Sequence, residues 1–137
     1  MKGCIFCKMI KGDIPAEKVF ENDYVIAVMD IHPKAPGHVM VIPKVHASNI
    51  LDLSDDEIKP LFLAVKKVAD MIYNALDPQG FTMGLNHGSV SGQEVDHIHF
   101  HIITRFEGDG GGSLHGVVDN PPDEKISDIA SKIRENE

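Results

Sequence analysis

The fold of this chain is indicated most clearly by the stretch His97-Ile98-His99-Phe100-His101-Ile102-Ile103. Imidazole side chains alternate there with large apolar ones at a period of two, which predicts a β-strand over residues 97–104 with one face on a hydrophobic core. His97, His99 and His101 then share the other face, about 6.5–7 Å from one to the next. Three groups that titrate near neutrality on one rigid surface indicate nucleophilic chemistry, a metal site, or both.

The segments around this stretch predict an antiparallel α+β fold. Ser54-Asp55-Asp56-Glu57 is a capping-box pattern, and it indicates a helix that runs from there to about residue 76. Connections of hairpin length early in the chain, with the helices segregated, disfavour a doubly wound sheet. The other expected elements are helices over 4–11 and around 126–133, and strands over 18–21, 24–31, 38–42 and 81–86.

Length and composition indicate one small globular domain that acts on a small ligand. The 137 residues carry a formal charge of −8 and show no basic stripe, which argues against binding a nucleic-acid backbone. There is no apolar run that resembles a signal peptide or could span a bilayer, so we expect a cytoplasmic protein with no membrane partner. Two cysteines make a disulfide scaffold an unfavoured interpretation.

Cys4-Ile5-Phe6-Cys7 places two thiols three residues apart near the start of the chain. Such a pair is compatible with zinc, with thioredoxin-like redox chemistry, or with ordinary packing. The redox interpretation expects a preceding strand and a βαβ unit, and neither is predicted here. Zinc would need two further ligands to complete a structural site.

Several blocks of this chain, in order, resemble the histidine triad (HIT) superfamily of nucleotide hydrolases and transferases. They are the histidine stretch itself, residues 29–38 (Met-Asp-Ile-His-Pro-Lys-Ala-Pro-Gly-His), residues 39–46 and residues 86–95. The resemblance covers residues 4–105. It is closest to the small nucleoside phosphoramidases often called protein kinase C inhibitor-like, in their zinc-containing prokaryotic type.

This resemblance implies a hydrolase of nucleoside 5′-phosphoramidates or purine nucleotide conjugates that forms a covalent nucleotidyl-histidine intermediate. It assigns the nucleophile to His99, the phosphate and the leaving-group proton to His101, and a supporting role to His38, with His97 as the first triad member. No cofactor is required for this catalysis. The nucleotide-binding residues that it implies are Phe6, Met9, Asp30, Ile31, Asn86, Gly92, Gln93 and Glu94.

The chemistry of these side chains agrees with the implied roles. A neutral imidazole can attack phosphorus, and the middle histidine has an imidazole on either side to orient it or to donate to phosphate oxygens. The Asp30 carboxylate can accept hydrogen bonds from both ribose hydroxyls. The backbone N–H groups of residues 89–92 can bind a phosphate. Glu94 departs from the Ser or Thr of many eukaryotic members, so its carboxylate should point away from the phosphate or meet a cationic leaving group.

The resemblance also implies a structural zinc site made of Cys4, Cys7, His46 and His97. Four protein ligands leave no open position on the metal, so a catalytic role for it is not expected. His97 would then belong both to the metal site and to the triad. The remaining histidines, His32, His87 and His115, match no motif and are expected at the surface.

For the architecture, the resemblance implies a five-stranded antiparallel sheet with a long helix and short terminal helices, continued as a ten-stranded sheet in a homodimer. Residues 1–106 would form the catalytic domain, and residues 107–137 a Gly-rich mobile linker and a helical tail. Two alternative functions stay open. The first is dinucleoside polyphosphate hydrolysis or nucleotidyl transfer, although a third histidine in place of glutamine disfavours the transferases. The second is a non-enzymatic nucleotide-binding protein.

Overall fold

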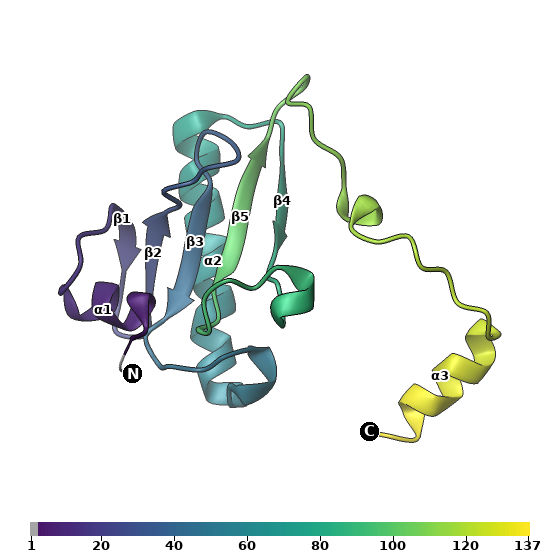
Figure 1. Ribbon diagram of the computed structural model, residues 1–137. Helices are drawn as coiled ribbons and strands as arrows, with labels where there is room; N and C mark the ends of the chain where they lie inside the picture. The colour runs from purple at the N-terminus through teal and green to yellow at the C-terminus, as the bar shows by residue number, and fades with distance from the viewer. Residues whose placement is uncertain (1–2) are drawn as a thin grey trace.

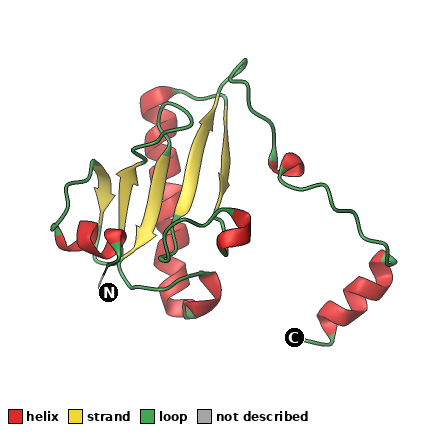
Figure 2. Ribbon diagram, viewed as in Figure 1, coloured by secondary structure: helices red, strands yellow, loops and turns green. Residues whose placement is uncertain are grey.

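A five-stranded antiparallel sheet forms the centre of the computed structural model, which describes residues 3–137 (Figures 1 and 2). The strand order is β1-β2-β3-β5-β4, so β1 and β4 are the two edges. The expected α+β class and antiparallel pairing are confirmed. The strands are β1 (Lys18–Glu21), β2 (Val25–Met29), β3 (Val39–Pro43), β4 (Gly80–Gly84) and β5 (Phe100–Arg105).

One long helix, α2 (Asp55–Leu76), covers one face of the sheet (Figure 1). It begins with the predicted capping box, in which the Ser54 hydroxyl accepts from the Glu57 N–H while the Glu57 carboxylate accepts from the Ser54 N–H. It ends at Asp77, whose backbone is left-handed at φ 50°. The apolar face of α2 packs on the inward side chains of the central strands, and this layer is the main core.

The short helix α1 (Ile5–Lys11) lies against the opposite face of the sheet, and it leaves part of that face open. Its buried side chains, Phe6 and Met9, pack on apolar residues of the first central strands, Ile26, Val28, Met40 and Ile42. Because Met40 pairs with His101 across β3 and β5, the triad side chains reach the same face beside α1. A second, smaller core therefore borders the histidines.

The strand that was expected over residues 97–104 is shorter at its start than the pattern suggests. β5 begins at Phe100, and residues 97–99 form an irregular approach in which the Ile98 N–H donates to the Ala47 carbonyl. The predicted alternation of faces still holds, since Ile98 and Ile102 are buried in the main core. Two other strands end earlier than expected, β2 at Met29 and β4 at Gly84, whereas β1 has the predicted bounds and β3 ends one residue later than predicted, at Pro43.

The chain after β5 leaves the sheet and runs past the β4 edge to helix α3 (Ile126–Arg134) (Figure 1). None of the residues of α3 is buried, although its isoleucines lie on one side of the helix. The expected C-terminal helix is confirmed. Over residues 3–137, none of the helices combines the length and apolar character needed to cross a bilayer.

Candidate functional site

A cavity of about 690 Å³ opens on the uncovered face of the sheet, between α1, the end of β2 and the start of β5. Phe6 and Met9 form an apolar wall on the α1 side, and Asp30 and Ile31 lie at the end of β2. Asn86, Gly92 and Glu94 contribute from the segment before the triad. The cavity thus brings together nearly all of the nucleotide-binding residues that were expected, with His38, His99 and His101 beside them.

His99 presents a bare ring nitrogen to this cavity. Its Nδ1 lies 2.7 Å from the His97 carbonyl oxygen, and because a carbonyl only accepts, Nδ1 carries the proton. In the neutral ring Nε2 then keeps a free lone pair. Phe6 packs edge-on against the imidazole, with the ring centroids 4.9 Å apart, which holds its orientation. His99 is therefore oriented as a nucleophile or base.

His38 and His101 form a hydrogen-bonded pair whose proton positions follow from the backbone. The Lys34 N–H donates to His38 Nδ1 at 3.1 Å, so the proton of neutral His38 is on Nε2. That Nε2 lies 2.9 Å from His101 Nδ1, which must accept. The proton of His101 is then on Nε2. His99 and His101 thus offer complementary groups, a lone pair on one and an N–H on the other.

The Asp30 carboxylate, at the end of β2, lies beside the His38–His101 pair. Its Oδ2 lies 3.4 Å from His38 Nε2 and 4.0 Å from His101 Nδ1, while Oδ1 accepts from the His32 N–H. The loop that carries His38 depends on Gly37, whose φ is +92° and where a Cβ would lie 2.6 Å from Leu76 Cδ1. A side chain at this position would strain the left-handed backbone and crowd the Leu76 and Thr104 side chains, so the turn before His38 favours glycine.

Burial keeps both members of the pair neutral in the free protein. Burial lowers the pKa of His101 to about 4, with repulsion from His99 and His38 adding to the shift and the Asp30 charge opposing it. The pKa of His38 is lowered for the same first reason, and again Asp30 opposes the shift. Neutral rings leave the proton positions derived above intact near neutral pH.

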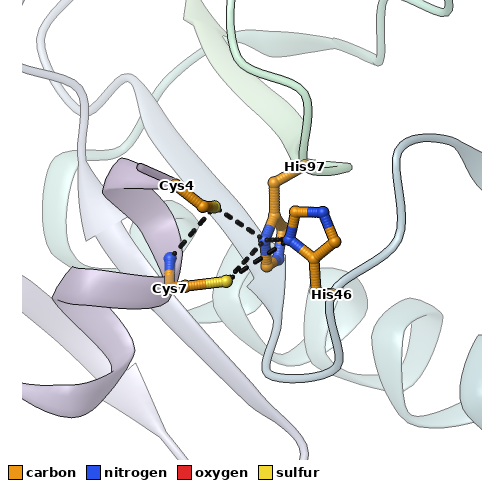
Figure 3. A group of neighbouring side chains, drawn as sticks. All are labelled: Cys4, Cys7, His46 and His97. Carbon is orange, nitrogen blue, oxygen red and sulfur yellow. Dashed lines mark hydrogen bonds between the residues drawn. The ribbon is translucent and has the colours of Figure 1, made fainter. Parts of the chain in front are cut away.

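A second cluster, of Cys4, Cys7, His46 and His97, lies at the start of α1 (Figure 3). His46 Nδ1 lies 3.2 Å from His97 Nδ1, and the sulfur-to-nitrogen distances are 3.4 Å (Cys4–His97), 3.3 Å (Cys7–His46) and 3.6 Å (Cys7–His97). Tetrahedral Zn²⁺ with its usual bond lengths would set about 3.3 Å between nitrogens and about 3.5 Å between sulfur and nitrogen. The four side chains therefore fit a metal ion of this kind.

The proton positions of this cluster also suit a metal. His97 is fully buried, and its Nε2 lies 2.9 Å from the Pro43 carbonyl oxygen, so Nε2 holds the proton and Nδ1 faces the cluster bare. Burial lowers the pKa of His97, which keeps the ring neutral. The Cys4 sulfur accepts from the Cys7 N–H, although burial raises the pKa of this thiol. A metal ion would supply the positive charge that favours the thiolate.

Asp30, His38 and His101 also lie close enough for one ion, with their ligand atoms within 4.8 Å of one another. Their proton positions do not suit it. His38 Nε2, the atom that faces the other two, carries the ring proton because Nδ1 is occupied by the Lys34 N–H. A metal would have to reverse that tautomer and set two N–H groups against each other. This cluster is arranged to hold protons.

Of the residues expected to take part in catalysis or nucleotide binding, two lie outside the cavity, Gln93 and His97. Gln93 braces its loop, since its carboxamide accepts from the Gly88 N–H and donates to the Ser48 and Val95 carbonyls. His97 faces the cysteines instead. The cavity lining also includes residues that were not singled out, His32, Lys34, Met40 and Ile103. Ile103 follows from the period of two after His99 and His101, and Met40 from its pairing with His101.

Comparison with known proteins identifies the same family by sequence and by structure. The HIT domain family matches residues 11–108 of this chain. An uncharacterised HIT-like protein of Methanocaldococcus jannaschii is 43% identical over 127 residues, which cover 92% of this chain and 98% of the relative. The adenosine 5′-monophosphoramidase hnt1 of Schizosaccharomyces pombe is 43% identical over 102 residues, 74% of each chain. A crystal structure of a HIT family member from Bacillus subtilis is 40% identical with a TM-score of 0.87, over 98% of this chain and 96% of that one.

Proposed function

This chain belongs to the HIT domain family, and from that starting point we propose that it hydrolyses nucleoside 5′-phosphoramidates through a covalent intermediate on His99. The observation that carries the proposal is the pairing of proton positions in the cavity. His99 Nε2 is a free lone pair and His101 Nε2 is a donor. A displacement at phosphorus needs one of each, the first for the attacking atom and the second for the departing one.

In the first step the His99 Nε2 lone pair attacks phosphorus and the P–N bond to the amine breaks. The departing nitrogen keeps the bonding electrons and takes the proton from His101 Nε2. Loss of this proton leaves a negative charge on the His101 ring, which the His38 N–H stabilises at Nδ1 and which the positive charge on the phosphorylated His99 ring balances.

In the second step water attacks the phosphorus of the nucleotidyl-histidine. Its proton passes to His101 Nε2, which was left bare by the first step, and the electrons of the P–N bond return to His99. The two steps restore both rings and release the nucleoside monophosphate. Splitting one displacement into two lets the same pair of imidazoles serve both.

The remaining lining residues suit a nucleotide. We assign the base to the apolar wall of Phe6 and Met9, next to Ile31, and the ribose hydroxyls to Asp30. We assign the phosphate to Asn86 and the backbone of Gly92, both of which line the cavity. A purine is the expected base, in keeping with the adenosine monophosphoramidase among the relatives.

We propose zinc for the metal at Cys4, Cys7, His46 and His97, with a structural role. The metal would tie α1 to the segment that enters β5, and so fix Phe6 against His99. No catalytic step uses it, because four protein ligands leave it no open position.

We also propose that the protein acts as a homodimer. β4 is an edge strand, and α2 carries exposed apolar side chains, among them Phe62, Leu63 and Tyr73. Pairing of β4 with a second copy would continue the sheet to ten strands and cover this surface. Sedimentation of a monomer at micromolar concentration would refute it.

The test of the proposed function is turnover of an adenosine 5′-phosphoramidate by the His99→Ala variant. Removal of a nucleophile should lower kcat by more than about a thousandfold. Binding of AMP, measured by calorimetry, should change little because the residues that we assign to the base and the ribose, Phe6, Met9 and Asp30, remain. His87→Ala, at an exposed histidine outside the cavity, is the control. Equal turnover in the His99 variant, or faster turnover of diadenosine polyphosphate by the wild type, would contradict the proposal.

A further inference from the structure

A second cavity, of about 240 Å³, adjoins the first at the end of β5. Lys34 and Ile103 line both cavities, so the two share a wall. Most of the exposed lining surface of the second one is apolar, although polar residues such as Thr82 and Arg105 also line it. Its apolar side chains are Ala35 from the loop before His38, Ile103 from β5, and Leu114 and Val117 from the chain after it. We propose that this cavity is the subsite for the leaving group and takes a neutral, apolar amine; the inference rests on the proposed function.

The direction of the reaction points to this cavity. His99, His101, Ile103 and Arg105 follow one another on the same face, at a period of two. The attacking nitrogen belongs to His99 and the proton donor to His101, so the departing atom leaves on the His101 side. The next side chain on that side is Ile103, which is the shared wall. The leaving group is thereby directed away from the metal cluster and into the apolar cavity.

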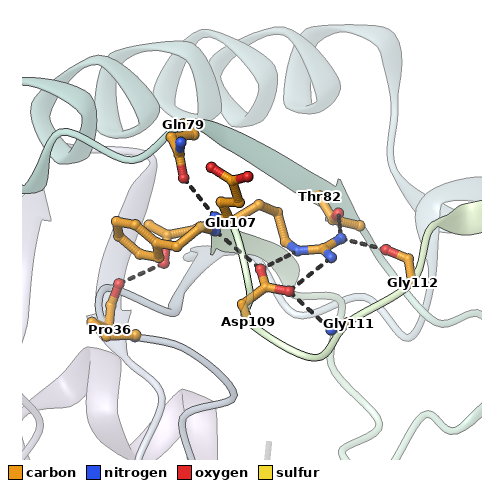
Figure 4. A network of polar contacts seen from close by, with 10 residues as sticks. Pro36, Gln79, Thr82, Glu107, Asp109, Gly111 and Gly112 are labelled. Carbon is orange, nitrogen blue, oxygen red and sulfur yellow. Dashed lines mark hydrogen bonds and ion pairs between the residues drawn. The ribbon is translucent and has the colours of Figure 1, made fainter.

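The outer wall of the cavity is held in place by the Arg105 side chain (Figure 4). Its guanidinium pairs with Asp109 at 2.8 Å and donates to Thr82 Oγ1 and the Gly112 carbonyl. Asp109 also accepts from the Phe106 and Gly111 N–H groups. The segment expected to be a mobile Gly-rich linker is therefore folded as a turn. This turn fixes the position of the backbone directly before Leu114.

Charge at the cavity favours a neutral group. The Arg105 charge is compensated by Asp109, whereas Lys34 at the junction carries a positive charge that reaches as far as His38. An ammonium at the far end of the leaving group would be repelled there. The volume is sufficient for an aromatic ring, since a dry cavity of about 150 Å³ already accepts benzene.

A competing cavity lies in the opposite direction, toward the metal cluster. It also adjoins the first, through Ile5, Glu94 and Val95, and it is lined by Asp96 and His46. Its two carboxylates would suit a cationic leaving group. The His101 side and the Glu94 side thus predict opposite preferences for charge, and an experiment can separate them.

The experiment compares adenosine 5′-phosphoramidates of ammonia, phenethylamine and 1,4-diaminobutane, using kcat/KM because it includes the departure of the amine. We expect phenethylamine to exceed ammonia by about tenfold, which is what removal of roughly 55 Å² of apolar surface from water provides. Leu114→Ser with Val117→Ser should abolish this preference and leave the ammonia compound unchanged. The control is Val118→Ser with Ile133→Ser, two positions of similar exposure that do not line the cavity.

Three other outcomes would overturn either the subsite or the proposed function. An unchanged phenethylamine preference in the Leu114 and Val117 variant would overturn the subsite. A preference for diaminobutane that Glu94→Gln removes would overturn it too, and would place the leaving group beside His46. Turnover of none of the three compounds would instead refute the proposed function, since the ammonia compound does not use the subsite.

Discussion

Two clusters of ligating side chains flank His99, and they look alike until their protons are placed. Cys4, Cys7, His46 and His97 lie on one side of it, and Asp30, His38 and His101 on the other. In both, the ligand atoms are within 4.8 Å of one another. The inward nitrogen of His97 is bare, whereas the inward nitrogen of His38 carries a proton. The proton positions of the first cluster suit a metal ion, and those of the second suit the proton transfer that we propose.

A single backbone atom makes the difference in each case. The Pro43 carbonyl accepts a hydrogen bond from the Nε2–H of His97, which keeps the proton on Nε2 and leaves Nδ1 bare for the cluster. The Lys34 N–H occupies Nδ1 of His38, which forces its proton to Nε2 and toward His101. An acceptor beside one ring and a donor beside the other therefore assign opposite roles to the same residue type.

The largest effect is expected from removing a metal ligand. Cys7→Ser should reduce the zinc content from about one ion per chain to none, and lower the free energy of unfolding by several kcal/mol, because structural zinc contributes about 10 kcal/mol or more in small domains. Metal analysis of chelator-free protein and thermal melts measure both. His38→Gln, in the other cluster, is the matched variant and should retain its zinc. A second ion per chain that is lost in His38→Gln would break the comparison.

Sequence reasoning, through the family resemblance, predicted the members of both clusters and their roles, but not the proton positions that suit each cluster to its role. Alternation placed His99 and His101 on one face, and the family resemblance supplied Asp30, His38 and the cysteine pair. The groups that set the tautomers are a carbonyl 54 residues away from His97 and an amide four residues before His38. Every residue but proline offers both groups, so no residue type reveals them. The turn after β5 was missed for a related reason, because it depends on one ion pair, Arg105 with Asp109.

A smaller effect is expected from His38, which acts through His101. His38→Ala should lower kcat by about a hundredfold, since His101 loses the donor that fixes its proton on Nε2. His38→Gln places an amide N–H near the position of Nε2 and should recover part of the loss, whereas His38→Asn, which reaches only the position of Nδ1, should not. Nitrogen NMR of His101 would report the tautomer in each variant. Equal kcat for Gln and Asn would mean that His38 only fills space.

The smallest effect concerns the loss of folding stability at low pH, and it tests His101 of the second cluster separately from the metal ligands. The pKa of His101 is about 4 in the folded protein, below its ordinary value of 6.5, so the unfolded chain binds more protons between these values. Stability therefore falls as pH falls from about 6.5 toward 4. The contribution of His101 is about 2 kcal/mol, after allowance for the exposed fifth of its side chain.

Urea unfolding at pH 7.5 and 4.5 should show a smaller loss in the free energy of unfolding for His101→Asn than for His87→Asn. Acid also weakens metal binding, but that loss is common to both variants and cancels in their difference, because the two clusters share no ligand. Equal losses would place the low pKa elsewhere and remove the ground for a neutral, proton-holding pair at His38 and His101.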